Sequence, residues 1–144
     1  IVGLGQAIKE IQNPKHKIEN IRIRQLRDKL IKNILKMIPD SNLNGSPVHR
    51  LPNNINISFQ GAEGEAIVIS LDQKGIAAST GSACSSKSLE PSHILLAMGF
   101  SEERAHGSLR ITLGRWTSQK EIEKLLKVLP PIIQKLRQIS GYQL

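Results

Sequence analysis

The sequence is short of cysteine, aromatic residues and long apolar runs. A single cysteine in 144 residues cannot form an internal disulfide, which is consistent with a reducing, cytoplasmic setting. Aromatic side chains make up 3% of the chain, so few are available to stack on nucleic-acid bases. No apolar run approaches the roughly 20 residues that a membrane-spanning helix needs. These shortages weigh against a disulfide scaffold and against a membrane protein.

The first ten residues, IVGLGQAIKE, have neither an initiator methionine nor a basic flank before a long apolar stretch. They therefore do not form a signal peptide. They open in the middle of a helical pattern, which predicts that the chain is a fragment. With 39% hydrophobic residues, a chain of this length is expected to build one domain with its own core.

The net charge is +8, and most of the basic excess lies in the first third of the chain. Residues 1–50 hold ten basic and four acidic side chains, and the basic ones lie mainly along an expected helix at residues 19–38. Such a helix can present a solvated face, a docking patch for an acidic partner, or a nucleic-acid-binding surface. The shortage of aromatic residues favours the first two.

Apolar periodicity and turn signals predict helices along much of the chain. We expect helices at residues 1–11, 18–38, 63–74, 91–98 and 118–140. Ser118 and Glu121 form a capping-box pattern at the start of the last helix. Pro130 and Pro131 are expected to split or kink that helix.

Apolar and polar residues alternate at 55–59 and 109–113, which predicts two strands, and residues 76–79 predict a third, short one. Residues 39–47 and 80–90 have the composition of loops. A few strands segregated from helices predict an α+β fold, a small antiparallel sheet covered by helices.

Cys84 lies in the second of these loops, within the run GSACSS at residues 81–86. A free cysteine is usually buried and packs as a small hydrophobe. Here Ala83 is the only apolar neighbour, and Lys87 can help to ionise the thiol. Cys84 is therefore a candidate nucleophile on an accessible loop, with a structural thiol as the alternative.

The histidines give no comparable signal. They are scattered over the chain, without a metal-ligand spacing such as CxxC or HExxH, so we predict no metal site. Nor is there an obvious histidine partner for a cysteine hydrolase. We read each histidine as a surface or capping residue; they are His16, His49, His93 and His106.

Arg110 alternates with Leu109 and Ile111, so its side chain should project from the face of the strand opposite the core. A guanidinium fixed on a strand is suited to bidentate capture of a carboxylate. From the spacing alone, an ordinary surface charge remains the alternative. Arg104 and Arg115 are further cations nearby, and no pattern ranks them.

Several motifs follow one another along nearly the whole chain. LPNNINISF at 51–59 is followed by EGE at 63–65, GSACSS at 81–86 and LEPSH at 89–93, and then by SEERAHGSLR at 101–110 and LGRWT at 113–117. In this order they resemble the NifS/IscS-type cysteine desulfurases, a branch of the class-V aminotransferases. The long Ser/Gly loop resembles the group that hands sulfur to Fe–S scaffold proteins.

The resemblance implies roles for two residues. Cys84 matches the nucleophile that takes sulfur from a cysteine–pyridoxal adduct, which leaves alanine and a persulfide. Arg110 matches the arginine that holds the carboxylate of the L-cysteine substrate. The fold implied is the C-terminal small domain of fold-type I pyridoxal-phosphate-dependent transferases. The intact enzyme is expected to be a cytoplasmic homodimer that delivers sulfur to Fe–S cluster assembly or to tRNA thiolation.

The family binds pyridoxal phosphate in a larger domain, and this chain is expected to begin after it. We expect residues 1–40 to form leading helices and residues 50–144 to form the α+β body, with the Cys loop at 79–90. Lys15 and Lys17 flank His16, but they lie in a polar linker without phosphate-binding residues. No residue of this chain is therefore expected to bind the cofactor, and the chain alone is expected to be inactive.

Two alternatives remain open. The first is a stand-alone sulfur-relay or interaction domain, in which Cys84 accepts sulfur from a partner and needs no cofactor. The second is a nucleic-acid-binding α+β module that uses the basic helix.

Overall fold

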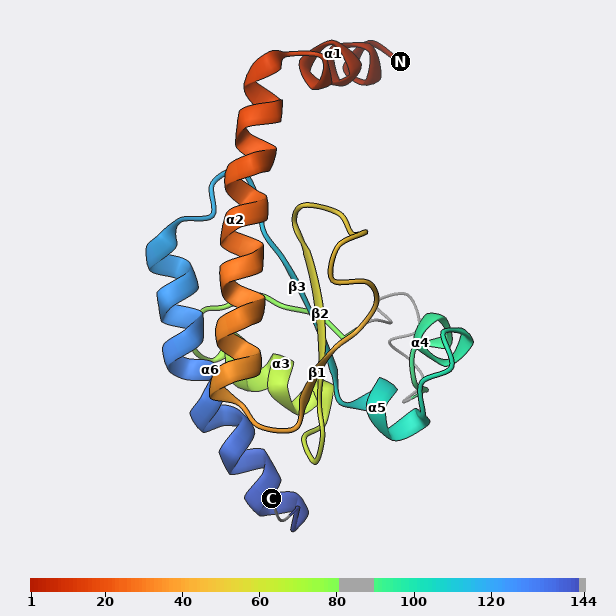
Figure 1. Ribbon diagram of the computed structural model, residues 1–144, viewed down its shortest axis with the longest axis vertical. Coiled ribbons are helices and arrows are strands. Elements are labelled where there is room, and N and C mark those ends of the chain that lie inside the picture. The colour runs from red at the N-terminus through yellow and green to blue at the C-terminus, as the bar shows by residue number, and fades with distance from the viewer. Residues whose placement is uncertain (81–89, 143–144) are drawn as a thin grey trace.

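The computed structural model describes residues 1–80 and 90–142, which form six helices and three strands. In chain order they are α1 (Val2–Ile11), α2 (Pro14–Met37), β1 (Ser41–Leu43), β2 (Asn54–Phe59), α3 (Gly64–Asp72), α4 (His93–Ala97), α5 (Glu102–His106), β3 (Ser108–Thr112) and α6 (Gln119–Ser140) (Figure 1). This arrangement confirms the α+β prediction.

The three strands form one antiparallel sheet in the order β1-β2-β3. Leu43 faces Ile57 across the first pair, and Ile57 faces Leu109 across the second, so the apolar residues of all three strands share one face. The strand predicted at 76–79 is wrong. Those residues make a single bridge, between Ser79 and Arg110. The prediction of a loop at residues 39–47 is partly wrong, because β1 lies within this range.

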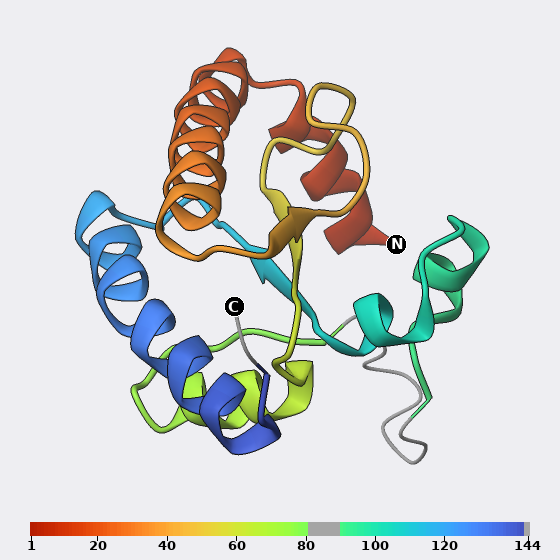
Figure 2. The same ribbon diagram turned by 60° about the horizontal axis from the view of Figure 1, so that its bottom comes forward.

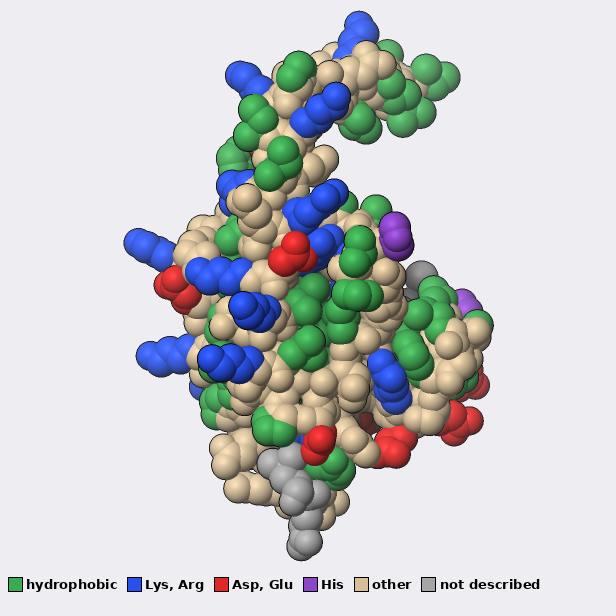
Figure 3. Space-filling model, viewed as in Figure 1, with side chains coloured by type: hydrophobic (Ala, Val, Ile, Leu, Met, Phe, Trp, Pro, Cys, Tyr) green, Lys and Arg blue, Asp and Glu red, His purple; other side chains and the backbone are tan. Residues whose placement is uncertain are grey.

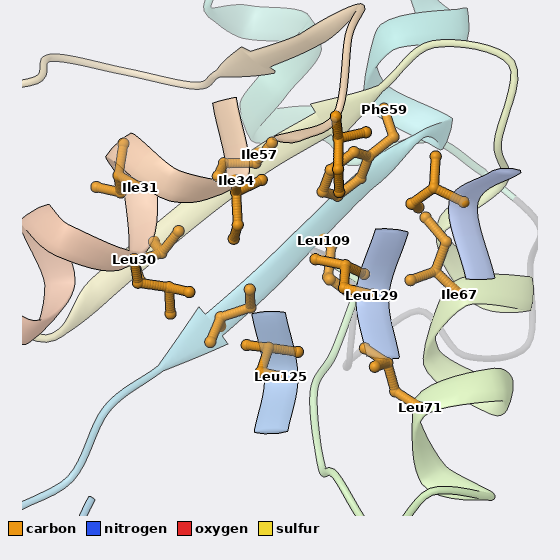
Figure 4. Packing of buried hydrophobic residues seen from close by; sticks show 14 of the residues in the cluster. Leu30, Ile31, Ile34, Ile57, Phe59, Ile67, Leu71, Leu109, Leu125 and Leu129 are labelled. Atoms are coloured by element: carbon orange, nitrogen blue, oxygen red, sulfur yellow. The ribbon is translucent and has the colours of Figure 1, made fainter. Parts of the chain in front are cut away.

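The core lies between the apolar face of the sheet and helices α2, α3 and α6 (Figure 4). Leu30 and Ile34 of α2, Ile67 of α3 and Leu129 of α6 are fully or almost fully buried against it. Each such side chain contributes roughly 1.5–3 kcal/mol through removal from water. In Figure 2 these helices lie on one side of the sheet, and α4 and α5 lie on the other.

The start of α2 and the whole of α5 differ from the sequence-based expectation. Asn13 caps α2 by accepting a hydrogen bond from the backbone N–H of Lys15 at 3.0 Å, and Pro14 occupies the first turn, where its missing N–H costs nothing. Residues 14–17 are therefore helical, and the linker assigned to them is wrong. The short helix α5, opened by the cap of Ser101, had no counterpart in the prediction.

Helix α6 begins with the predicted capping box of Ser118 and Glu121. It does not split at Pro130 and Pro131, which lie inside one helix that runs to Ser140. Buried residues on both sides of the proline pair, Leu129 and Ile133 among them, hold the helix against α2, α3 and the core. This packing compensates for the backbone hydrogen bonds that the two prolines cannot donate.

Helix α1 and the first turns of α2 project from the body (Figure 1). No residue of α1 is buried, although it carries several apolar side chains. Within residues 1–80 and 90–142, no helix is both long and apolar enough to cross a membrane.

Candidate active site

Arg110 lies in the middle of β3, on the polar face of the sheet, as its alternation with buried Leu109 and Ile111 predicts. Its side chain is half-buried. The antiparallel register places Asn56 of β2 directly beside it. On the other side of Asn56 lies Asn44, whose backbone N–H donates to the Asn56 carbonyl at 2.9 Å. Asn44, Asn56 and Arg110 therefore form a row across the polar face of the sheet.

Ser79 completes this row on the far side of β3. Its backbone N–H donates to the Arg110 carbonyl at 3.2 Å, and its carbonyl accepts from the Arg110 N–H at 2.7 Å. The residue after it, Thr80, is the last one described before residue 90. The chain therefore enters the segment that contains Cys84 directly beside Arg110.

Gly64 determines how closely α3 approaches the start of β3 and Thr80. A Cβ atom at residue 64 would lie 2.5 Å from the carbonyl oxygen of Ser108 and 2.8 Å from that of His106. It would also lie 3.0 Å from the Cγ2 atom of Thr80. Only glycine permits this approach, which brings the start of α3, the start of β3 and Thr80 together.

The side chains on the polar face form a hydrogen-bonded network centred on Asn44, which is 3% exposed. The Asn44 amide nitrogen donates to Oδ1 of Asn56 and to Oγ of Ser58, both at 2.7 Å. Its amide oxygen accepts from Nε of Arg104 at 3.0 Å. Both hydrogen-bonding ends of this buried side chain are therefore satisfied, as burial requires.

Two further arginines donate hydrogen bonds to the backbone carbonyls of Leu43 and Asn44. Arg104 of α5 also donates to the Leu43 carbonyl, and its guanidinium lies 3.9 Å from the centre of the Phe100 ring. Arg50 donates to the carbonyl of Asn44 at 2.6 Å, and burial, followed by the nearby charge of Arg27, lowers its pKa below the ordinary value. These two arginines therefore place positive charge beside the polar face at its Asn44 end, with the acidic Glu103 next to Arg104.

Cys84 and Lys87 lie outside the described residues, so the predicted nucleophile and its neighbouring cation stay predictions. The predictions for the histidines concern described residues. His16 pairs with Glu19 at 3.0 Å, and His49, His93 and His106 are exposed. Over residues 1–80 and 90–142, no three His, Cys, Asp or Glu residues are grouped as a metal site would require.

The lysines of residues 1–80 and 90–142 do not provide a site for pyridoxal phosphate. Every lysine in the described part of the chain is exposed, Lys15 and Lys17 included. A Schiff-base lysine needs an enclosed cradle for the phosphate and the pyridine ring. The described residues therefore do not fit this cofactor.

Two of the basic side chains on α2 have internal partners. Arg22 donates to the backbone carbonyls of Thr117 at 2.9 Å and Arg115 at 2.6 Å. Arg27 is 3% exposed and binds the Leu51 carbonyl and Asp28. The other Lys and Arg side chains of α2 are exposed, and Figure 3 shows basic side chains spread over this face of the molecule.

Sequence patterns did not predict that Asn44, Asn56 or Arg104 belong to the site. One signal was available for Asn56, because it alternates with Ile55 and Ile57 onto the polar face. Asn44 lies after a three-residue strand that has no clear pattern of its own. Its position depends on strand register, which a short polar segment does not specify.

A family model described as aminotransferase class-V matches residues 1–125. The chain belongs to the class-V aminotransferase family. It is 54% identical over 140 residues to cysteine desulfurase IscS 1 of Archaeoglobus fulgidus, an alignment that covers 97% of this chain and 36% of that protein. It is 46% identical over 143 residues to cysteine desulfurase NifS of Azotobacter vinelandii, which covers 99% of this chain and 35% of that one.

The fold is likewise similar to the crystal structure of a NifS-like protein from Rickettsia africae. The TM-score is 0.69 and the sequence identity 31%, over 80% of this chain and 29% of that one. The chain therefore spans about a third of the length of the relatives that it matches.

Proposed function

We propose that the chain is the C-terminal domain of a pyridoxal-phosphate-dependent cysteine desulfurase. In this proposal residues 1–40 lead into a body at 50–144 that carries the cysteine loop at 79–90. The high identity to proteins named as cysteine desulfurases supports the reaction class. The observation that carries the assignment of the site is the pair of backbone hydrogen bonds between Ser79 and Arg110.

In the proposed reaction Arg110 holds the carboxylate of L-cysteine. A guanidinium can donate two parallel hydrogen bonds to a carboxylate, and the paired charges strengthen both. Arg110 is half-buried, so part of its hydration has already been removed before the substrate binds. Because it is fixed on a central residue of a paired strand, it orients the substrate as well as binding it.

Cys84 accepts the sulfur. Its thiolate forms a bond to the sulfur atom of the substrate, and the bond between that sulfur and its carbon breaks. The electron pair stays with the carbon skeleton, which takes a proton and becomes alanine. The product on the protein is a persulfide of Cys84. A thiolate is required because the thiol is a much weaker nucleophile.

The described residues do not fit pyridoxal phosphate, so we assign the cofactor to the part of the polypeptide that the longer relatives carry. The intact enzyme is then proposed to be a cytoplasmic homodimer. Its sulfur acceptors would be an Fe–S scaffold protein or the machinery of tRNA thiolation. A chain limited to these residues would not turn over cysteine by itself.

The test is alanine formation from L-cysteine by the full-length enzyme, in wild type and Cys84→Ser. Ser85→Ala is the matched control, since it removes one hydroxyl from the adjacent residue. We expect loss of alanine formation in Cys84→Ser and near-normal rates in the control. Near-normal alanine formation by Cys84→Ser would refute the assignment.

A further inference from the structure

The row of Asn44, Asn56 and Arg110 has a defined direction of hydrogen bonding. Arginine can only donate, so the bond from Arg104 Nε identifies the Asn44 atom facing it as the amide oxygen. The other end of Asn44 is therefore the nitrogen, a donor toward Asn56 at 2.7 Å. Asn56 must in turn present its oxygen to Asn44. One charged side chain on α5 thus sets the orientation of two amides on the sheet.

This orientation has a consequence on the β3 side of the row. With its oxygen directed at Asn44, Asn56 carries its two N–H donors on the side away from Asn44. Arg110 lies on that side, because it is the register partner of Asn56 on β3 and shares its face. Side chains of directly opposed residues on one face of a sheet have Cβ atoms about 5 Å apart.

We infer that Asn56 is a second substrate-binding residue, whose amide N–H donates to the same carboxylate that Arg110 binds. Asn44 and Arg104 are positioning residues that keep this donor on the correct side. The inference rests on the proposed role of Arg110. A reversed Asn56 amide would place its oxygen beside the carboxylate, where two acceptors repel each other.

Burial favours this arrangement over a merely structural network. Asn44 and Ser58 are 3% and 2% exposed, so water cannot readily replace their hydrogen bonds. Asn56 is only half-buried, so it combines a fixed orientation with access to a ligand. Arg104 and Arg50 lie at the Asn44 end of the row, so Arg110 is the cation at the end where the carboxylate is proposed to bind.

The first test is the KM for L-cysteine in the full-length enzyme with Asn56→Ala. A hydrogen bond to a charged group typically changes affinity by about 10- to 100-fold. We expect the KM to rise by that factor while kcat changes by less than about threefold. Urea unfolding of the same variant checks that the fold is intact.

A second variant separates orientation from stability. Asn44→Asp can still accept from Arg104, and gains a charge pair, but it cannot donate to Asn56. The Asn56 amide should then reverse, and the KM should rise about as much as in Asn56→Ala without a loss of stability. Asn42→Asp is the control, because it adds the same charge to the same face of the sheet, opposite Ser58, at an exposed residue that makes no hydrogen bond to Asn44 or Asn56. Its KM should stay within about threefold of wild type.

Arg110→Ala, measured beside these variants, separates the role of Asn56 from the existence of the proposed carboxylate site. If Arg110→Ala raises the KM and Asn56→Ala does not, the role of Asn56 is refuted while that of Arg110 stands. If neither raises it, the proposed carboxylate site itself is refuted. Equal KM values for Asn44→Asp and Asn42→Asp would refute the positioning role of Asn44.

Discussion

Gly64→Ala tests the close approach that brings α3, β3 and Thr80 together. The added methyl group would lie 2.5 Å and 2.8 Å from two backbone oxygens, which cannot rotate away as a side chain could. Helix α3 must therefore shift outward by several tenths of an ångström. Overpacking of this kind costs roughly 1–3 kcal/mol. The gain in helix propensity offsets little of it, because Gly64 is the first residue of α3.

The measurement is urea unfolding of the chain, followed by circular dichroism. Gly114→Ala is the matched control, since the nearest atom to its added Cβ is Thr117 Oγ1 at 3.9 Å. We expect the control to stay within about 0.5 kcal/mol of wild type, and Gly64→Ala to lose roughly 1–3 kcal/mol. Equal free energies of unfolding for the two variants would refute the close packing. In the full-length enzyme, Gly64→Ala should also slow turnover, because α3 contacts Thr80 at the entry to the Cys84 segment.

Four further outcomes follow. Arg110→Ala in the full-length enzyme should raise the KM for L-cysteine by roughly one to two orders of magnitude. An unchanged KM and rate would show that Arg110 is an ordinary surface charge. Residues 1–144, mixed with equimolar pyridoxal phosphate, should not form a Schiff base at one specific lysine. A borohydride-reduced adduct on a single lysine would show a cofactor site that the described residues do not provide. Arg137→Ala should lower the free energy of unfolding, measured in urea, by about 3 kcal/mol, because this buried guanidinium donates to the carbonyls of Gln60, Pro39 and Asp40. A loss below about 1 kcal/mol would contradict a stabilising role for these hydrogen bonds. Ser118→Ala should lose about 1 kcal/mol near neutral pH. Hydrogen bonds from the backbone and hydroxyl of Ser118 lower the pKa of Glu121 below its ordinary value of 4.5. The ionised carboxylate therefore stabilises the fold above pH 4.5, and this contribution is lost as the pH falls through the lowered pKa. The difference between wild type and Ser118→Ala should therefore shrink in acid, and a constant difference from pH 7 to pH 3 would count against the capping box.

The elements with a strong local signal could be predicted from the sequence. Strand β2, strand β3 and the capping box of α6 follow from alternation and from one four-residue motif, and the face on which Arg110 lies follows from the same alternation. The start of α2 was not predicted, although Asn13 and Pro14 suit a cap and a first turn. The same two residues equally suit a helix end, and local sequence alone did not decide between these interpretations.

The rest depends on contacts between distant parts of the chain. Strand β1 exists because Ser41–Leu43 pairs with β2, and three residues carry too little pattern to predict it. The bond between Arg104 and Asn44 joins residues 60 positions apart. Helix α6 does not split at Pro130 and Pro131, because it packs against α2 and α3, whereas local propensity predicts a split or a kink. The network around Asn44 is therefore a product of register and helix docking.

The central claim is that Cys84 takes the sulfur of L-cysteine, and the mass of the protein tests it most directly. The full-length enzyme, given L-cysteine and analysed by peptide mass spectrometry, should gain one sulfur atom on the peptide that contains Cys84. A thiol reductant should remove it. Cys84→Ser should gain no sulfur and form no alanine, while its free energy of unfolding stays within about 0.5 kcal/mol of wild type. A stable added sulfur on another residue, or alanine formation by Cys84→Ser at the wild-type rate, would contradict the account.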